Sequence, residues 1–293
     1  MRMLACVLAL SFTCLCSGEP PSIQGPAGFL KGLASKEGSV RKQATEWYWR
    51  GRHEQPGPEW PMSVAAHVQS LWNDADADHR SDLVWALRLV GGDERLELDE
   101  RERAVRLVVL ARHDAVTSVK EDVARSLGLL TDEEAVAERA VTVLLTMART
   151  EQASAVLEKV LFALGNLREH AAAATPVFVE YLHADDRPGL RRAAARSLIA
   201  VNPKHEKALD AWRVLIDLLK PGREHFHRSG LLVSIKHLWQ GSLNDLSNSN
   251  DFAELAIPAL EKIEEESEAT LEGPRIKRQA REALTAIRGD TSF

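Results

Sequence analysis

Cysteine is nearly missing from this chain of 293 residues: the sequence holds three, Cys6, Cys14 and Cys16, all close to the amino terminus. The rest of the chain offers no pair for a disulfide framework and no thiolate that could act as a nucleophile or bind zinc. Any chemistry in the body of the protein must therefore come from other side chains.

Aromatic residues are also scarce, at 5%, and positive charge is not in surplus, since 43 acidic residues stand against 37 lysines and arginines for a formal charge of −6. A protein that binds nucleic-acid phosphates needs a basic stripe, so we expect no nucleic acid as a partner. Alanine, leucine, glutamate and arginine are abundant instead, and these residues favour helices because they lose little side-chain freedom there. The sequence predicts a mostly α-helical protein.

The usual catalytic and cofactor motifs are missing too. The sequence contains no HExxH, GxSxG, GxxxxGK[ST] or GxGxxG pattern, and these mark metalloproteases, serine hydrolases, P-loop enzymes and dinucleotide binders. We therefore predict a non-enzymatic protein without a cofactor. Dispersed catalytic residues would leave no such signature.

Two partial metal patterns fall short of a site. The alternating acids from Asp74 to Asp78 begin like a calcium loop, but His79 replaces the required glycine and Trp85 replaces the closing glutamate. The second pattern consists of Glu224, His225, His227 and His237. It offers at most one pair of ligands one helical turn apart, whereas a zinc site needs three or four ligands.

The amino terminus has the form of an export signal. Arg2 precedes an apolar stretch from Leu4 to Leu15, which ends in small residues before Glu19. Such a stretch is shorter than the roughly 20 residues that span a bilayer, so we expect residues 1–18 to be a cleaved signal peptide, no stable membrane span, and a periplasmic or secreted protein. Anchoring through an uncleaved signal or a lipid is the alternative.

Apolar residues recur in steps of four, four and three, as in Val119, Val123, Leu127 and Leu130. These steps place the side chains on one face of a helix. Seven such sets occur, and we expect the third residue of each set to lie in the core: Tyr48, Leu87, Leu127, Leu164, Leu198, Ile235 and Leu284.

A second helical pattern precedes these sets, for example at 99–113, 135–149, 207–220 and 252–266. Each repeat is therefore predicted to be a pair of antiparallel helices, which must stack on its neighbours to bury its apolar face. The longest interval between sets contains the polar run 241–251, which we interpret as a loop insertion. The repeats are expected to fill residues 19–290 and to leave 291–293 as a tail.

Charges also follow the repeat. A base opens the second helix in six of the seven repeats, and an acid lies in the turn before it, as with Arg80 and Asp76. The acid can accept the free N–H groups at the start of the helix, and the base can pair with it or with the acid of the next repeat. The pattern predicts a ladder of ion pairs between repeats.

These features resemble the HEAT repeats. The match is best over Thr175 to Val201, with Pro176 in the first helix, acids in the turn and Ala194 and Leu198 in the core of the second helix. The resemblance implies an all-α, right-handed α-solenoid of about seven helix pairs. It also implies a scaffold or adaptor that binds a protein or peptide on its concave face. The alternative is a ligand-handling or catalytic HEAT-like protein, comparable to the lyase-like members.

The helical positions opposite the core stripe should line the inner curve. If Val123 faces the core, Glu121 and Arg125 lie on the opposite side, because successive residues are about 100° apart. The middle of this surface mixes apolar side chains with arginines, a composition typical of interface anchors; an ordinary solvated face is the alternative. We call the candidate partner-binding residues the concave ridge: Trp85, Arg125, Phe162, Arg192, Arg196 and Val233.

Five of the seven tryptophans lie between positions 47 and 85. They could bind a partner, but terminal repeats have a neighbour on one side only and are often completed by large side chains. We therefore favour a core role for this set: Trp47, Trp49, Trp60, Trp72 and Trp85.

Overall fold

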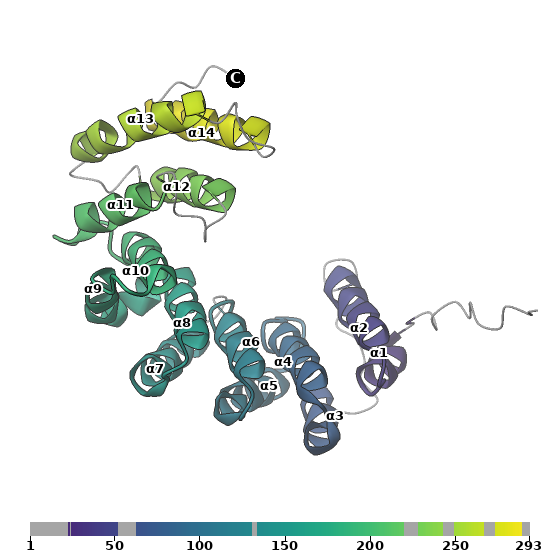
Figure 1. Ribbon diagram of the computed structural model, residues 1–293. Helices are drawn as coiled ribbons and strands as arrows, with labels where there is room; N and C mark the ends of the chain where they lie inside the picture. Colours follow the sequence, from purple (N-terminus) through teal and green to yellow (C-terminus); the bar gives the residue numbers. More distant parts are fainter. Residues whose placement is uncertain are drawn as a thin grey trace, which may run out of the picture.

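The computed structural model describes residues 23, 25–51, 63–130, 134–219, 228–242, 249–266 and 273–288. Over these residues it is an open arc of helices with no strand (Figure 1). The predicted signal peptide at 1–18 and the tail at 291–293 lie outside them. Across the same residues, none of the helices combines the length and the apolar character needed to cross a bilayer.

The described helices form seven consecutive pairs, as the repeat predicts, and the α-solenoid is confirmed. The pairs are α1 (Gly25–Leu33) with α2 (Gly38–Gly51), α3 (Val64–Leu71) with α4 (Ala77–Gly91), α5 (Leu98–Leu110) with α6 (Thr117–Leu127), α7 (Glu134–Thr150) with α8 (Ser154–Asn166), α9 (Thr175–Leu182) with α10 (Pro188–Val201), α11 (Ala208–Asp217) with α12 (Arg228–Ser242), and α13 (Ser249–Glu266) with α14 (Gly273–Arg288). Short 3-10 helices occupy three connections: η1 (Trp72–Asp74), η2 (Ala111–His113) and η3 (Arg168–Ala174).

The even-numbered helices form one continuous inner layer in which each packs on the next, from α2 to α14. The odd-numbered helices lie on the outside of the arc, where contacts between successive repeats are sparser (Figure 1). Because the inner helices approach one another more closely than the outer ones, the stack curves toward them. The inner layer therefore forms the concave side.

The predicted core is confirmed. All seven central stripe residues are buried, and they belong to one hydrophobic cluster that runs through the whole described chain. Burying these side chains is the main source of stability, at about 25 cal/mol for each Å² of apolar surface. A solenoid depends on this because no single helix pair has a core of its own.

The ladder of ion pairs is present in the first three repeats. Arg80 Nε lies 2.7 Å from Asp114 Oδ2 of the next repeat, and Lys120 Nζ lies 2.9 Å from Glu151 Oε2. Arg41 departs from the prediction, because it pairs with Asp82 on α4 and donates to two carbonyls of its own turn instead of meeting a turn acid.

The turn acids also accept hydrogen bonds from backbone N–H groups, and Asp76 caps α4 as predicted, whereas Asp114 and Glu151 bind N–H groups of the turns before α6 and α8. Asp76 Oδ1 accepts from the N–H of His79 at the start of α4, and Asp114 Oδ1 accepts from the N–H of Val116. Glu151 accepts from two N–H groups in the same way, and the hydrogen bond from Ala153, helped by Lys120, holds the pKa of Glu151 below its ordinary value. The carboxylates of Asp114 and Glu151 thus each accept hydrogen bonds from N–H groups of their own turn and from a base of the preceding repeat.

The sixth repeat is the least regular. Its first helix, α11, packs mainly on α10, and α12 makes fewer contacts with α10 than the other central inner helices make with their neighbours. The predicted insertion at 241–251 is shorter in the structure, since α12 continues to Ser242 and α13 begins at Ser249. The stack is therefore loosest between α10 and α12.

Small residues allow the closest approach of the inner helices. A Cβ added to Gly165 on α8 would lie 2.8 Å from the Cβ and 2.9 Å from the Cα of Ser197 on α10. Gly128, just after α6, meets Ala163 of α8 in the same way. A larger residue at either position would push two repeats apart.

We expect Gly165→Ala to lower the free energy of unfolding by about 1–3 kcal/mol, the usual cost of overpacking a tight contact. Gly230→Ala is the matched control, because Gly230 is also helical and has no atom within 4 Å of the added Cβ. The control should be neutral or gain up to about 1 kcal/mol from better helix propensity. Urea unfolding followed by circular dichroism measures both, and equal stabilities would contradict the close-packing argument.

Candidate functional site

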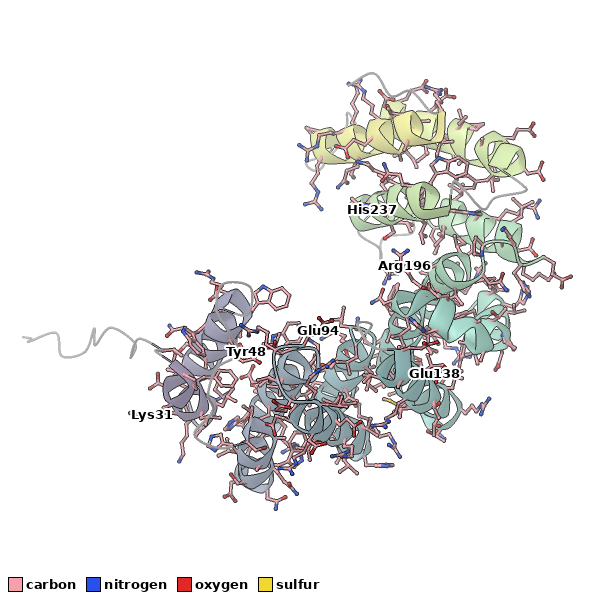
Figure 2. The ribbon with its side chains drawn as sticks, turned by 180° about the vertical axis from the view of Figure 1, so that it is seen from behind. Lys31, Tyr48, Glu94, Glu138, Arg196 and His237 are labelled. Atoms are coloured by element: carbon pink, nitrogen blue, oxygen red, sulfur yellow. The ribbon has the colours of Figure 1, made fainter. Side chains whose placement is uncertain are left out.

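All six residues of the concave ridge lie on helices of the inner layer. None of the six is in the buried core, and each is at least partly exposed. The positions opposite the core stripe thus lie outside the core on the concave side, where Arg196 is seen in Figure 2. They are Trp85 on α4, Arg125 on α6, Phe162 on α8, Arg192 and Arg196 on α10, and Val233 on α12.

The centre of the ridge is a cluster of one aromatic ring and two arginines. The guanidinium carbons of Arg192 and Arg196 lie 5.4 and 5.1 Å from the ring centroid of Phe162. Arg192 also pairs with Glu158 of α8 at 2.6 Å. Cation–π contacts at this distance are worth about 0.5–2 kcal/mol, so α8 and α10 hold these side chains in place together.

Arg196 differs from its neighbour because it has no matching anion. Among the described residues, no carboxylate lies within ion-pair distance of it, whereas Arg192 has Glu158. Burial lowers the pKa of Arg196, and the charge of Arg192 lowers it further. The centre of the ridge therefore carries a positive charge that no ion pair among the described residues balances.

A hollow of about 560 Å³ opens beside Arg196, between the ends of the inner helices and α12. It contains two residues of the concave ridge, Arg196 and Val233, and brings Arg168 and His237 to them. Figure 2 shows Arg196 and His237 on the same inner side of the arc. No acidic side chain is found among the described residues that line the hollow. They are Gly128, Leu129, Gly165, Asn166, Arg168, Arg196, Ala200, Val233, Ser234, His237 and Leu238.

Arg168 is not among the site residues that the sequence predicts, and His237 was expected at most to be a metal ligand. His237 lies one helical turn beyond Val233, so continuing the ridge pattern by four residues would have found it. Arg168 follows no helical pattern, because it begins η3 directly after α8. It is the one residue other than glycine with a positive φ, 49°, within the described part of the chain.

The structure does not bring the whole ridge into one site. Arg125 pairs with Asp122 at 2.5 Å and with Glu121 at 3.5 Å, both on its own helix. Trp85 belongs to a separate group, in which the guanidinium of Arg88 lies 4.1 Å from the Trp85 ring centroid and 5.8 Å from that of Trp49. The ridge therefore has an aromatic end at α2 and α4 and a cationic centre at α8 to α12.

The tryptophan set divides between the core and the surface. Trp47 and Trp72 pack against the hydrophobic cluster, as the core interpretation predicted. Trp49 and Trp85 are 44% and 40% exposed, so for them that interpretation was wrong. Trp60 lies outside the described residues.

The candidate metal ligands do not assemble in the described part of the chain, where no group of three His, Cys, Asp or Glu side chains is placed to hold an ion. Asp76 of the acidic run caps α4. Glu224, His225 and His227 lie outside the described residues, and His237 lines the cationic hollow.

A buried polar network joins the first two repeats. The Tyr48 hydroxyl donates to Asp93 Oδ2 at 2.5 Å, and Arg95 donates to both oxygens of the same carboxylate. Burial alone would raise the pKa of Asp93, but the hydrogen bonds from Arg95 and Tyr48 outweigh it and hold that pKa below its ordinary value. Burial also raises the pKa of Tyr48 far above its ordinary value.

The architecture and the site together define a helical solenoid with an aromatic and cationic concave face. No protein-family model and no curated protein matches the chain. Two solved structures are similar to it over most of its length. The complex of CpcE and CpcF of phycocyanin lyase from Nostoc sp. PCC7120 has a TM-score of 0.49 and 19% identity, covering 94% of this chain and 100% of that one. A crystal structure of an engineered protein has a TM-score of 0.39 and 17% identity, covering 89% and 95%.

These likenesses concern the fold, and one of them corrects a prediction. The first structure is of a phycocyanin lyase complex, and it contradicts the prediction that the chain is non-enzymatic.

We expect Asp93→Asn to lower the free energy of unfolding by about 2–3 kcal/mol at pH 7, because Arg95 loses its buried partner. Since folding lowers the pKa of Asp93, its contribution is present above the unfolded value, near pH 4, and is lost as pH falls through the folded value. The difference between the variant and the unmodified chain should therefore shrink below pH 4.

Urea unfolding at pH 7, 5 and 3 measures this difference. Asp210→Asn is the control, because Asp210 pairs with Arg213 on the surface of α11 and such pairs contribute about 0–1 kcal/mol. A destabilisation by Asp93→Asn that stayed constant from pH 7 to pH 3 would show that the ionised carboxylate is not the stabilising group.

Proposed function

We propose that this chain is a partner-binding solenoid that holds an extended protein segment along its concave ridge. The observation that carries the proposal is the cluster of Phe162, Arg192 and Arg196. Aromatic and arginine side chains are enriched at the centres of interfaces. Because these three already hold one another in place, a partner would meet them with little further loss of side-chain freedom.

The dimensions of the ridge support an extended partner. At roughly 9 Å between packed helices, seven layers span about 60 Å, and a fully extended chain of about 18 residues covers that length. The exposed pair of Trp49 and Trp85 gives such a segment a second contact at the amino-terminal end of the arc. The proposal includes export of the chain, for which the support is the signal-like sequence at 1–18.

A ligand-handling or catalytic HEAT-like protein is the second candidate, and the hollow beside Arg196 favours it. The volume of about 560 Å³ lies in the range of small-molecule sites, roughly 300–1,000 Å³. Titratable side chains converge there, namely Arg168, Arg196 and His237, as they do in many active sites. In this second function the ridge would hold a partner protein while the hollow receives its ligand.

We expect the double variant Trp85→Ala and Arg196→Ala to weaken partner capture at least about tenfold, the cost of removing one interface anchor worth more than 1.4 kcal/mol. The midpoint of thermal unfolding should change little, because both side chains lie outside the core. Affinity capture with the purified chain, compared by quantitative mass spectrometry with the double variant, measures the first effect. A large loss of thermal stability would show that these residues are structural, and the ridge would no longer be supported as a binding surface.

A further inference from the structure

The hollow beside Arg196 lies where the inner layer is least closed. α12 makes fewer contacts with α10 than α10 makes with α8 or α12 with α14. The ends of α6 and α8 reach the same place through Gly128, Leu129, Gly165 and Asn166. The hollow is therefore formed by the looser packing between neighbouring repeats, and side chains from several helices line it.

Basic side chains from three elements line this hollow. Arg168 comes from the start of η3, Arg196 from α10 and His237 from α12. Arginine has only donors, and histidine has at least one. The described structure supplies no carboxylate among the lining residues, so their natural complement is an anion from outside the chain.

Arg168 occupies its position at a conformational cost. Its φ of 49° lies in the left-handed region, which costs a residue with a Cβ about 1–2 kcal/mol and costs glycine almost nothing. Strained residues of this kind cluster at ligand sites. A glycine would suit the backbone better, and yet an arginine stands there and lines the hollow.

The rest of the lining is aliphatic. Leu129 is one of the few large apolar side chains exposed in the described chain, at 42%. Ala200, Val233 and Leu238 line the hollow with it. The hollow thus offers donors for an anionic group beside a surface for an apolar one.

We propose that this hollow anchors the bound protein segment by taking up an aspartate or glutamate side chain that has an aliphatic residue beside it. The inference rests on the proposed function, because it places the anchor on the same segment that the ridge holds. Arg196 and Val233 belong to both surfaces, so a segment lying along the ridge passes over the hollow. A carboxylate there forms charge-assisted hydrogen bonds and balances the unmatched charge of Arg196.

The experiment selects binders from a library of random twelve-residue peptides displayed on phage, with the purified full chain as bait. We expect enrichment of peptides with an acidic residue next to leucine, isoleucine or valine. The most enriched peptide and its counterpart with glutamine or asparagine in place of the acid are then compared by fluorescence polarisation. Losing one charge-assisted contact should weaken binding about tenfold or more.

Three variants test the site with the same peptide. Arg196→Gln and Arg168→Gly should each weaken binding about tenfold, while Arg139→Gln, exposed on the outer helix α7, should not. Arg168→Gly is the sharpest of these, because it should leave the thermal unfolding midpoint unchanged or raise it. Weaker binding by a chain of equal or greater stability cannot be explained by damage to the fold.

The outcomes separate the two proposals. If peptides are enriched but the neutral counterpart binds equally well, the proposed carboxylate anchor is wrong and the proposal of a binding ridge is retained. If no peptide is enriched, both fail. Binding of octanoate and of octanol to the chain is measured separately by isothermal titration calorimetry. If octanoate binds but octanol does not, if Arg196→Gln abolishes this binding, and if no peptide binds, the inference is wrong and the hollow is a site for a small carboxylate ligand.

Discussion

Close packing of the inner helices is the constraint on which the rest of this molecule depends. Each helix pair is too small to bury its own apolar face, so every repeat is stable only while its neighbours cover it. Glycine at position 165 and serine at 197 let α8 and α10 approach until their backbones are nearly in contact. This approach on one side of the stack, without an equal approach on the other, produces the curvature and hence the concave face.

Ion pairs follow the same stacking and adapt where it changes. In the first three repeats a base near the start of the second helix reaches a carboxylate of the next repeat. The fourth repeat has Leu157 at that position, and there the contact between repeats is made by Glu158 and Arg192 instead. Arg192 is thereby paired, whereas no carboxylate among the described residues pairs with Arg196. The cationic centre of the ridge therefore lies next to the repeat in which the ladder changes.

The core and the ridge could be predicted from the sequence because each depends on one helix at a time. When Leu164 faces the core, helical geometry places Phe162 on the opposite side of the same helix, and this placement does not depend on how the neighbouring helices pack. The partner of Arg41 could not be predicted in this way, since Asp82 comes within reach only through the register between repeats. The exposure of Trp49 and Trp85 depends likewise on where the arc ends.

The hollow shows the limit of single-helix reasoning most clearly. Arg168, Arg196 and His237 lie in three successive repeats. His237 continues the ridge pattern one helical turn beyond Val233, but no helical spacing in the sequence places Arg168 beside them. They meet because the chain turns through the left-handed residue Arg168 two positions after α8 ends, and because α12 stands off from α10. The close approach at Gly128 and Gly165 forms one wall of the hollow, and the looser contact of α12 with α10 leaves the space open on the other side. A change in packing between neighbouring repeats thus creates a hollow beside Arg196 that uniform stacking would close.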